Sequence, residues 1–137
     1  AGAVEQMLMK YGQSHDLIFV EGQGSLLNPA STATLPLLRG TQPTHLILVH
    51  KAGQTHIKNC PHIKIPPLKD VIHMYEQIAS AAGAFHPAPV TALTLNTSEL
   101  DLEAAKLAIN EIEAEIGLAC TDVFRFDIDK ILNSILA

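Results

Sequence analysis

Hydrophobic residues along the chain form short continuous runs that alternate with longer stretches of helical spacing. The runs Leu17–Val20, His45–Val49 and Pro89–Leu95 are typical of strands that are covered on both faces. A fourth, more polar strand is expected over Thr121–Phe126. Because strands and helices alternate, the pattern predicts an α/β fold, a three-layer parallel sheet of about four strands flanked by helices.

The stretches between these runs have apolar positions three and four residues apart, which predicts amphipathic helices. A first helix is expected over residues 3–11, and Asn28 and Pro29 are typical of the start of a second, which runs to about Leu38. Further helices are expected over residues 68–82, from a cap at Ser98 or Asp101 to residue 116, and from a cap at Asp127 to residue 136. Residues 50–67 contain three prolines and are expected to form a long loop.

The 137 residues fit one domain, residues 1–137. No apolar run approaches the roughly 20 residues that span a bilayer, and no signal segment opens the chain, so membrane association is not expected. Two cysteines, Cys60 and Cys120, are too few and too far apart for a disulfide framework. A cytoplasmic location is therefore expected.

The net charge of −5 is unevenly distributed along the chain. No Asp or Glu occurs between Glu21 and Asp70, and this stretch contains Arg39, Lys51, Lys58, Lys64 and Lys69 together with four histidines. An acid-free stretch of this length favours an anionic ligand, such as a phosphate-bearing small molecule, or is a solvated basic face without one. Nucleic acid is not expected as a partner, because the whole chain is acidic and aromatic residues are only 4%.

Residues with catalytic potential follow the first expected strand. In Asp16–Leu26, which reads DLIFVEGQGSL, this strand is followed by Glu21 and then by Gly22, Gly24 and Ser25. Ligands of parallel α/β sheets bind beyond the carboxyl ends of the strands. A carboxylate there could hold a Mg²⁺-bound water near phosphates or act as a general base, and the glycines could let backbone N–H groups approach a ligand. Alternatively, Glu21 caps a helix and the glycines only turn the chain.

The second expected strand leads into His50 and Lys51, and a lysine at this position could pair with a phosphate. An ordinary basic loop is the alternative. The chain contains no G-x-x-x-x-G-K-[ST], and the G-x-G of Gly22 and Gly24 lacks the third glycine of a dinucleotide fingerprint. A complete phosphate-binding loop is therefore absent from this sequence.

His56, Cys60 and His62 raise a separate hypothesis, that of a zinc site. Their spacing, H-x3-C-x-H, fits the usual pairs of zinc ligands poorly, and His50 is the residue that could complete the set.

Four segments together are similar to the domain-of-unknown-function 1611 family: HDLIFVEGQGSLLNPA (His15–Ala30), LVHKAGQ (Leu48–Gln54), IPPLKDVIHMYEQIA (Ile65–Ala79) and NTSELD (Asn96–Asp101). The resemblance covers essentially the whole chain. It implies a Rossmann-like domain followed by a P-loop NTPase-like domain, of which this chain would be the C-terminal part. The Rossmann-like domain and the Walker A loop would then lie upstream of Ala1. Some members of the family are D-glutamate N-acetyltransferases that use acetyl-CoA.

The resemblance also implies roles for single residues. Glu21 matches the acidic, Walker-B-like position, and Gly22, Gly24 and Ser25 match the glycine loop. His50 and Lys51 fall where related enzymes contact a base. Gly53 replaces the acid that is usual there, so purine specificity does not carry over.

The sequence and the resemblance together predict a fragment of a nucleotide- or acyl-CoA-binding enzyme. Mg²⁺ with ATP, or acetyl-CoA, is the expected cofactor, and Glu21 is the expected catalytic residue and magnesium ligand, directly or through water. The fragment is expected to be inactive alone, because the phosphate-binding loop is missing. The alternative is a non-catalytic binding or assembly module, a homo-oligomer formed through an uncovered sheet edge or face.

Overall fold

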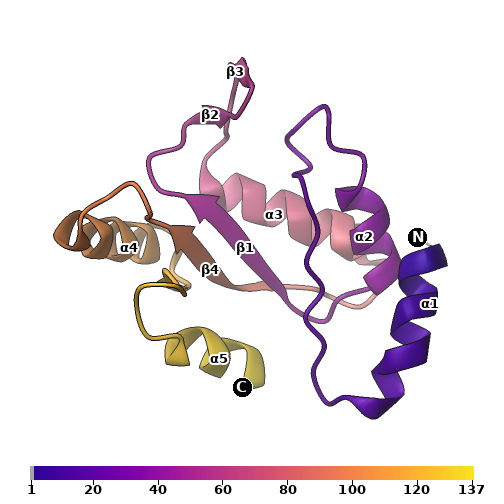
Figure 1. Ribbon diagram of the computed structural model, residues 1–137. Helices are drawn as coiled ribbons and strands as arrows, with labels where there is room; N and C mark the ends of the chain where they lie inside the picture. Colours follow the sequence, from indigo (N-terminus) through magenta and orange to yellow (C-terminus); the bar gives the residue numbers. More distant parts are fainter. Residues whose placement is uncertain (1) are drawn as a thin grey trace.

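The computed structural model describes residues 2–137, which form an α/β fold (Figure 1). The helices are α1 (Gly2–Tyr11), α2 (Thr34–Thr41), α3 (Leu68–Ala79), α4 (Leu102–Ile116) and α5 (Asp129–Leu136), with 3₁₀ turns at Gly12–Ser14 and Ala81–Gly83. The strands are β1 (Leu46–Lys51), β2 (His56–Ile57), β3 (Cys60–Lys64), β4 (Val90–Asn96) and β5 (Ala119–Thr121).

The main sheet is parallel and has the order β1-β4-β5, with Leu48 opposite Leu93 and Thr94 opposite Thr121. Helices connect its strands along the chain, as parallel pairing requires. The strands β2 and β3 form a separate antiparallel hairpin within the expected loop 50–67. Sequence reasoning missed this hairpin because its strands are short and polar.

Helices cover both faces of the sheet, which confirms the predicted three layers (Figure 1). On one face, Leu68 of α3 and Ile109 of α4 pack in one cluster with Leu93, Leu95 and Cys120. On the other face, Ile131 and Ile135 of α5 pack against Ala92. The residues Ala92 and Leu93, which are adjacent in β4, are both 0% exposed, so β4 is the central strand of the core.

The expected buried strand Leu17–Val20 is not a strand in the structure. These residues are extended but belong to neither sheet, and Leu17 and Phe19 are 44% and 63% exposed. A strand requires a hydrogen-bonded neighbour, and a cleft separates this segment from β1. The apolar run was correctly identified, but within residues 2–137 it has no strand beside it to pair with.

The expected fourth strand, Thr121–Phe126, shares only Thr121 with β5, which runs over Ala119–Thr121, so the prediction began and ended too late. The Asp122 carboxylate accepts a hydrogen bond from the N–H of Phe124 at 3.0 Å. The N–H groups of Arg125 and Phe126 donate to the carbonyl oxygen of Asp122 at 3.1 and 2.9 Å. These local bonds turn the chain at Asp122 and end the strand.

The predicted helix starts are right for one helix and early for another. Asp101 caps α4, and its carboxylate accepts from the N–H of Ala104 at 2.8 Å. Asn28 does not cap α2, which begins only at Thr34. Its side chain instead accepts from the N–H of Ala30 at 3.0 Å, and this Asx-turn uses the oxygen that a helix cap would need.

Both cysteines are free, Cys60 half-buried on β3 and Cys120 fully buried on β5. Burial raises the pKa of the Cys120 thiol to about 11, with smaller opposing contributions from the charges of Lys130 and Glu113. Within residues 2–137, every helix is too short or too polar to cross a membrane.

Candidate functional site

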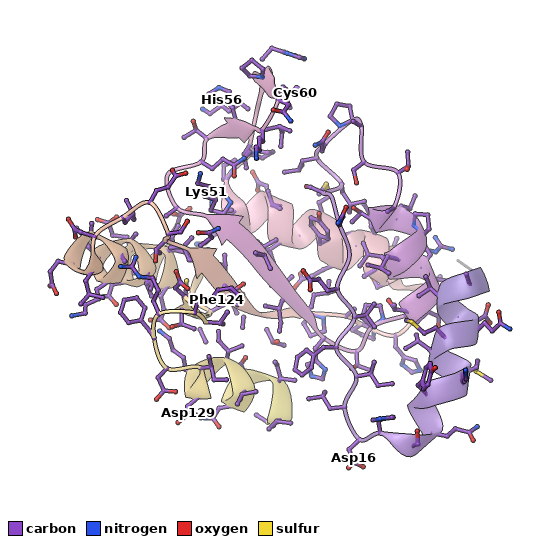
Figure 2. The ribbon with its side chains drawn as sticks, in the orientation of Figure 1. Asp16, Lys51, His56, Cys60, Phe124 and Asp129 are labelled. Carbon is purple, nitrogen blue, oxygen red and sulfur yellow. The ribbon has the colours of Figure 1, made fainter. Side chains whose placement is uncertain are left out.

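All the site residues predicted from the sequence line one cleft of about 890 Å³ between residues 17–27 and β1. They are Glu21, Gly22, Gly24, Ser25, His50 and Lys51. Lys51 lies at the carboxyl end of β1, where its side chain is labelled in Figure 2. Two groups of residues that are 25 or more positions apart in sequence therefore face one cleft, at the edge of the sheet where α/β proteins bind ligands.

The two glycines allow the loop after Glu21 to pack tightly on α2 and the turn before it. Gly24 has a φ of +93°, and a Cβ atom there would lie 2.0 Å from Ser31 Oγ. A Cβ atom on Gly22 would lie 2.2 Å from the Leu37 side chain. The glycines thus have a packing role in this loop, and their contact with a ligand stays a prediction.

Helix α3 fixes the end of the same loop through Tyr75. The Tyr75 hydroxyl accepts a hydrogen bond from the N–H of Leu26 at 3.0 Å and donates to Ser25 Oγ at 3.4 Å. Ser25 Oγ also accepts from the N–H of Leu27 at 3.1 Å. Glu21 is exposed, and no side chain of residues 2–137 is hydrogen-bonded to its carboxylate. The end of the loop is therefore held by hydrogen bonds, whereas the Glu21 carboxylate is exposed to solvent.

His50 and Lys51 differ in the charge they bring to the cleft. Burial lowers the pKa of His50, so its imidazole is neutral near pH 7. Lys51 is charged, and its Nζ donates to Glu99 Oε1 at 2.5 Å in an exposed pair. An anion that binds Lys51 would have to displace the Glu99 carboxylate from the Lys51 ammonium group, or bind that group together with it.

A buried polar network joins the carboxyl ends of β4 and β5, and sequence reasoning missed it. One carboxylate oxygen of Asp122 accepts from the N–H of Thr97 at 3.0 Å and from its hydroxyl at 2.6 Å. Arg125 Nη1 donates to the carbonyl oxygens of Thr97 and Leu100 at 2.8 and 3.0 Å. The sequence signal was a polar residue directly after each of the two strands: Thr97 follows β4, and Asp122 follows β5.

The pKa of Asp122 is lowered by this network. Burial alone would raise the pKa, but the hydrogen bonds from Thr97 and Phe124 and the charge of Arg125 outweigh it. The carboxylate is therefore ionised, and both of its oxygens accept hydrogen bonds within the chain. Its geometry is that of a structural support for the two loops.

The zinc hypothesis is wrong for the described residues, 2–137, which contain no group of three or more His, Cys, Asp or Glu side chains placed to hold a metal. His56 and Cys60 lie on the β2–β3 hairpin, above the carboxyl end of β1 in Figure 2. In this hairpin His56 lies opposite Lys64, and Cys60 lies opposite Ile57. Neither of these two residues therefore has another of the three candidate ligands as its strand partner.

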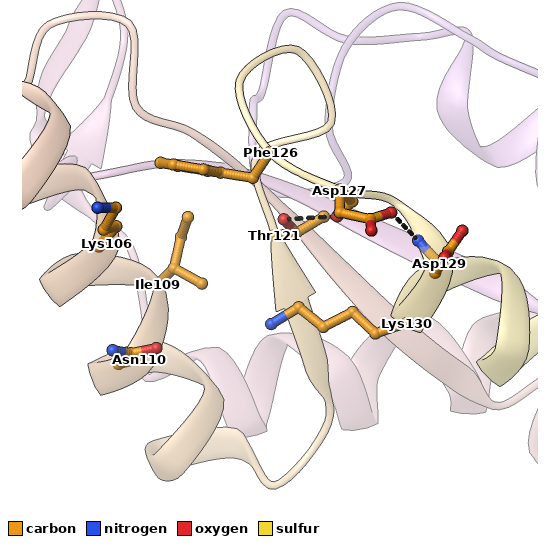
Figure 3. Close-up of a pocket in the computed structure, with 8 residues that line it drawn as sticks. All are labelled: Lys106, Ile109, Asn110, Thr121, Phe126, Asp127, Asp129 and Lys130. Atoms are coloured by element: carbon orange, nitrogen blue, oxygen red, sulfur yellow. Dashed lines mark hydrogen bonds between the residues drawn. The ribbon is translucent and has the colours of Figure 1, made fainter.

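A second cavity, of about 490 Å³, lies between α4 and α5 beside β5 (Figure 3). It contains none of the predicted site residues. Two of its polar side chains are partnered within the chain: Thr121 Oγ1 donates to the carbonyl oxygen of Asp127 at 3.2 Å, and Lys130 Nζ donates to Glu113 at 3.1 Å. The candidate site is therefore the cleft beside β1.

A parallel sheet between two helical layers, with polar loops at its carboxyl edge, defines an α/β domain. Residues 1–132 match the family described as "Domain of unknown function (DUF1611_C) P-loop domain". The chain belongs to this DUF1611 family, as its sequence predicted.

Two curated relatives, from Tritonibacter scottomollicae and a Pseudoalteromonas species, are named D-glutamate N-acetyltransferase. Each is 30% identical to this chain and matches 100% and 98% of it, respectively, but the chain spans only 40% of either relative. A crystal structure of a DUF1611 family protein from Anabaena variabilis is 58% identical, with a TM-score of 0.96 over 98% of this chain and 39% of that protein.

Proposed function

We propose that this chain forms part of an enzyme that transfers an acetyl group from acetyl-CoA to the amino group of a D-amino acid such as D-glutamate. The names of the two curated relatives support the reaction class. The single observation that carries the assignment of the site is that Glu21, the glycine loop, His50 and Lys51 line one cleft.

In this reaction the amine nitrogen of the acceptor attacks the thioester carbonyl carbon. A C–N bond forms, the C–S bond breaks and the CoA thiol leaves. The attacking amine must lose a proton, and Glu21, the one acidic residue among those that line the cleft, would accept it. Because Glu21 is exposed and has no hydrogen-bonded partner among residues 2–137, its carboxylate is available to a substrate.

The phosphates of acetyl-CoA, or of ATP, would lie toward Lys51 and the acid-free basic stretch. A lone carboxylate suits a Mg²⁺ ion that keeps most of its waters and shares its remaining ligands with phosphates. Glu21 would hold such an ion, and no second carboxylate lines the cleft from which a cage of protein ligands could be built. When bound, the ion would neutralise phosphate charge.

Two measurements test this proposal. Isothermal titration of the 137-residue chain with acetyl-CoA and, separately, with MgATP shows which phosphate-bearing ligand it holds. An acetyl-transfer assay on the full-length protein that carries this segment, with D-glutamate as acceptor, tests the reaction. Glu21→Gln should lower kcat about 10²- to 10⁴-fold with little change in acetyl-CoA affinity, as expected for loss of a general base. Unchanged turnover in this variant would remove the role assigned to Glu21.

A further inference from the structure

The β2–β3 hairpin projects from the carboxyl end of β1 (Figure 1). The N–H of Gln54 donates to the carbonyl oxygen of Lys51 at 3.1 Å, which turns the chain from β1 toward the hairpin. The N–H of Ile65 donates to the carbonyl oxygen of Thr55 at 2.8 Å and closes the base of the hairpin. The hairpin is therefore held by hydrogen bonds at its base, and it lies at the same end of the sheet as the candidate site.

The two faces of the hairpin differ in character. His62 and Lys64 are two positions apart on β3 and His56 lies opposite Lys64, so these three exposed side chains lie on one face. Ile57 and Ile65 each follow one of these residues and belong to the other face. Both isoleucines line the cleft, and Ile57 is only 8% exposed. The face formed by His56, His62 and Lys64, which we call the basic face, is therefore on the side away from the cleft.

A further cation lies at the tip of the hairpin. Lys58 and Asn59 form the turn between Ile57 and Cys60, which are paired across the two strands. Asn59 has a φ of +66°, a left-handed conformation that asparagine adopts more readily than most residues. The turn thus has an ordinary geometry, and it presents the exposed Lys58 beyond the ends of both strands.

The cations of the hairpin have no carboxylate partner. None of the ion pairs within residues 2–137 involves a hairpin residue. The chain has no acid between Glu21 and Asp70, so the hairpin itself supplies no negative charge. An imidazole keeps at least one N–H donor in either protonation state. Lys58, Lys64 and the two histidines are therefore available to an external anion.

The position of the basic face distinguishes between the ligands considered for the cleft. An acyl group that reacts near Glu21 must lie inside the cleft, whereas the basic face lies on the other side of the hairpin. A ligand that meets both must leave the cleft past Lys51 and continue along the hairpin. Acetyl-CoA has this form, because a long pantetheine arm separates its thioester from a nucleotide that carries a 3′-phosphate. ATP has neither the arm nor the 3′-phosphate.

The charge of this phosphate also suits the basic face. A phosphate monoester has a charge of about −1.5 to −2 at pH 7 and three strong acceptor oxygens. Lysine binds phosphate as a point charge, and imidazole N–H groups can add hydrogen bonds. Each contact is modest at an exposed site, so the recognition depends on several donors acting together.

We propose that Lys58 and the basic face of the hairpin bind the 3′-phosphate of a CoA thioester. The hairpin would then select CoA thioesters over ATP, although it lies outside the cleft. This inference rests on the proposed function, because the cleft must hold the acyl end of the same molecule.

Amide NMR of the 137-residue chain locates the site. CoA should shift the amide signals of residues 56–64, whereas dephospho-CoA, which lacks only the 3′-phosphate, should leave them in place. The absence of hairpin shifts with CoA would overturn the proposal. Shifts of the same size with dephospho-CoA or with MgATP would also overturn it, because the hairpin would then not distinguish the 3′-phosphate.

Two double variants separate the hairpin from the total charge of the chain. Lys58→Gln with Lys64→Gln removes two cations of the hairpin, and Lys10→Gln with Lys106→Gln removes two from α1 and α4. Isothermal titration at low salt should show that the parent binds acetyl-CoA about five- to tenfold more tightly than acetyl-dephospho-CoA. The hairpin variant should lose this preference and the control variant should retain it. Loss of the preference in both variants, or in neither, would contradict the proposal.

The failure of this inference can be told apart from the failure of the proposed function. Equal affinities of the parent for acetyl-CoA and acetyl-dephospho-CoA would remove the role of the hairpin and leave acetyl transfer intact. A negative acetyl-transfer assay, with hairpin shifts that need the 3′-phosphate, would remove the reaction and support the phosphate site. Thermal unfolding confirms that both double variants are folded.

Discussion

The carboxylate of Asp122 accepts two hydrogen bonds from Thr97, one from its N–H at 3.0 Å and one from its hydroxyl at 2.6 Å, although the residues are 25 positions apart. Asp122 is 4% exposed and Thr97 is 1% exposed. The contact joins the loops that follow β4 and β5, so it sets the shape of the carboxyl edge of the sheet.

Removing this contact should destabilise the fold strongly. Asp122→Ala leaves two buried donors of Thr97 without a partner and is expected to cost about 3 kcal/mol of unfolding free energy. Thr97→Val keeps the backbone bond and should cost about 1–2 kcal/mol. Urea denaturation measures both. A loss below about 1 kcal/mol for Asp122→Ala would show that the network contributes little.

The same carboxylate should make stability depend on pH in the acid range. Its pKa in the folded chain is lower than the ordinary value of 3.8, so the unfolded chain binds the proton more readily. The stability that Asp122 contributes is therefore complete well above pH 3.8 and is lost as the pH falls through the folded pKa. Denaturation curves between pH 6 and pH 3 should show a shallower decline for Asp122→Asn than for the parent.

Burial of His50 predicts a second dependence, near neutrality. Because its pKa is below 6.5, the unfolded chain binds a proton at a higher pH than the folded chain. Stability should decline as the pH falls through 6.5, and the decline should be smaller in His50→Gln. At pH 8 the histidine is neutral in both the folded and the unfolded chain, so its protonation should no longer affect the unfolding free energy there. An equal slope in parent and variant would show that His50 is solvated.

Gly24 and Gly53 form a matched pair for testing the loop. Both have positive φ, but a Cβ atom on Gly24 would meet Ser31 Oγ at 2.0 Å, whereas the space around Gly53 is open. Gly53→Ala should cost about 1 kcal/mol for the backbone alone, and Gly24→Ala about 2–4 kcal/mol because overpacking is added. Equal losses in urea denaturation would mean that the loop can move away from α2.

The pair of Lys51 and Glu99 predicts opposite effects on ligand binding. Both side chains are exposed, so breaking their ion pair should change stability by less than about 1 kcal/mol. Glu99→Gln releases Lys51 and should tighten acetyl-CoA binding a few-fold, whereas Lys51→Met should weaken it a few-fold. Calorimetry at low salt measures both affinities. If both substitutions changed the acetyl-CoA affinity in the same direction, Lys51 would not be the residue that contacts the anion.

Local patterns were sufficient to predict most of the fold. The expected strands His45–Val49 and Pro89–Leu95 correspond to β1 and β4 within one or two residues, because short continuous apolar runs favour strands. The cap at Asp101 was predictable for the same reason, since its carboxylate bonds to a residue three positions along the chain.

What the sequence did not predict depends on contacts between distant residues. Leu17–Val20 has the composition of a strand, but strand formation needs a neighbour, and only the structure shows that β1 lies across a cleft. Asp122 looked like an ordinary polar strand residue, because its partner Thr97 is distant in sequence. The six candidate site residues line one cleft in the structure, and their roles stay predictions.

The contrast between the two cysteines makes the folded chain selective toward thiol reagents. Cys120 is fully buried and its pKa is raised to about 11, so almost no thiolate forms at pH 7.5, whereas Cys60 is half-buried on the exposed hairpin. A maleimide dye should therefore attach first to Cys60 alone. The rate at which Cys120 is modified afterwards then measures how often the core opens, without any engineered probe.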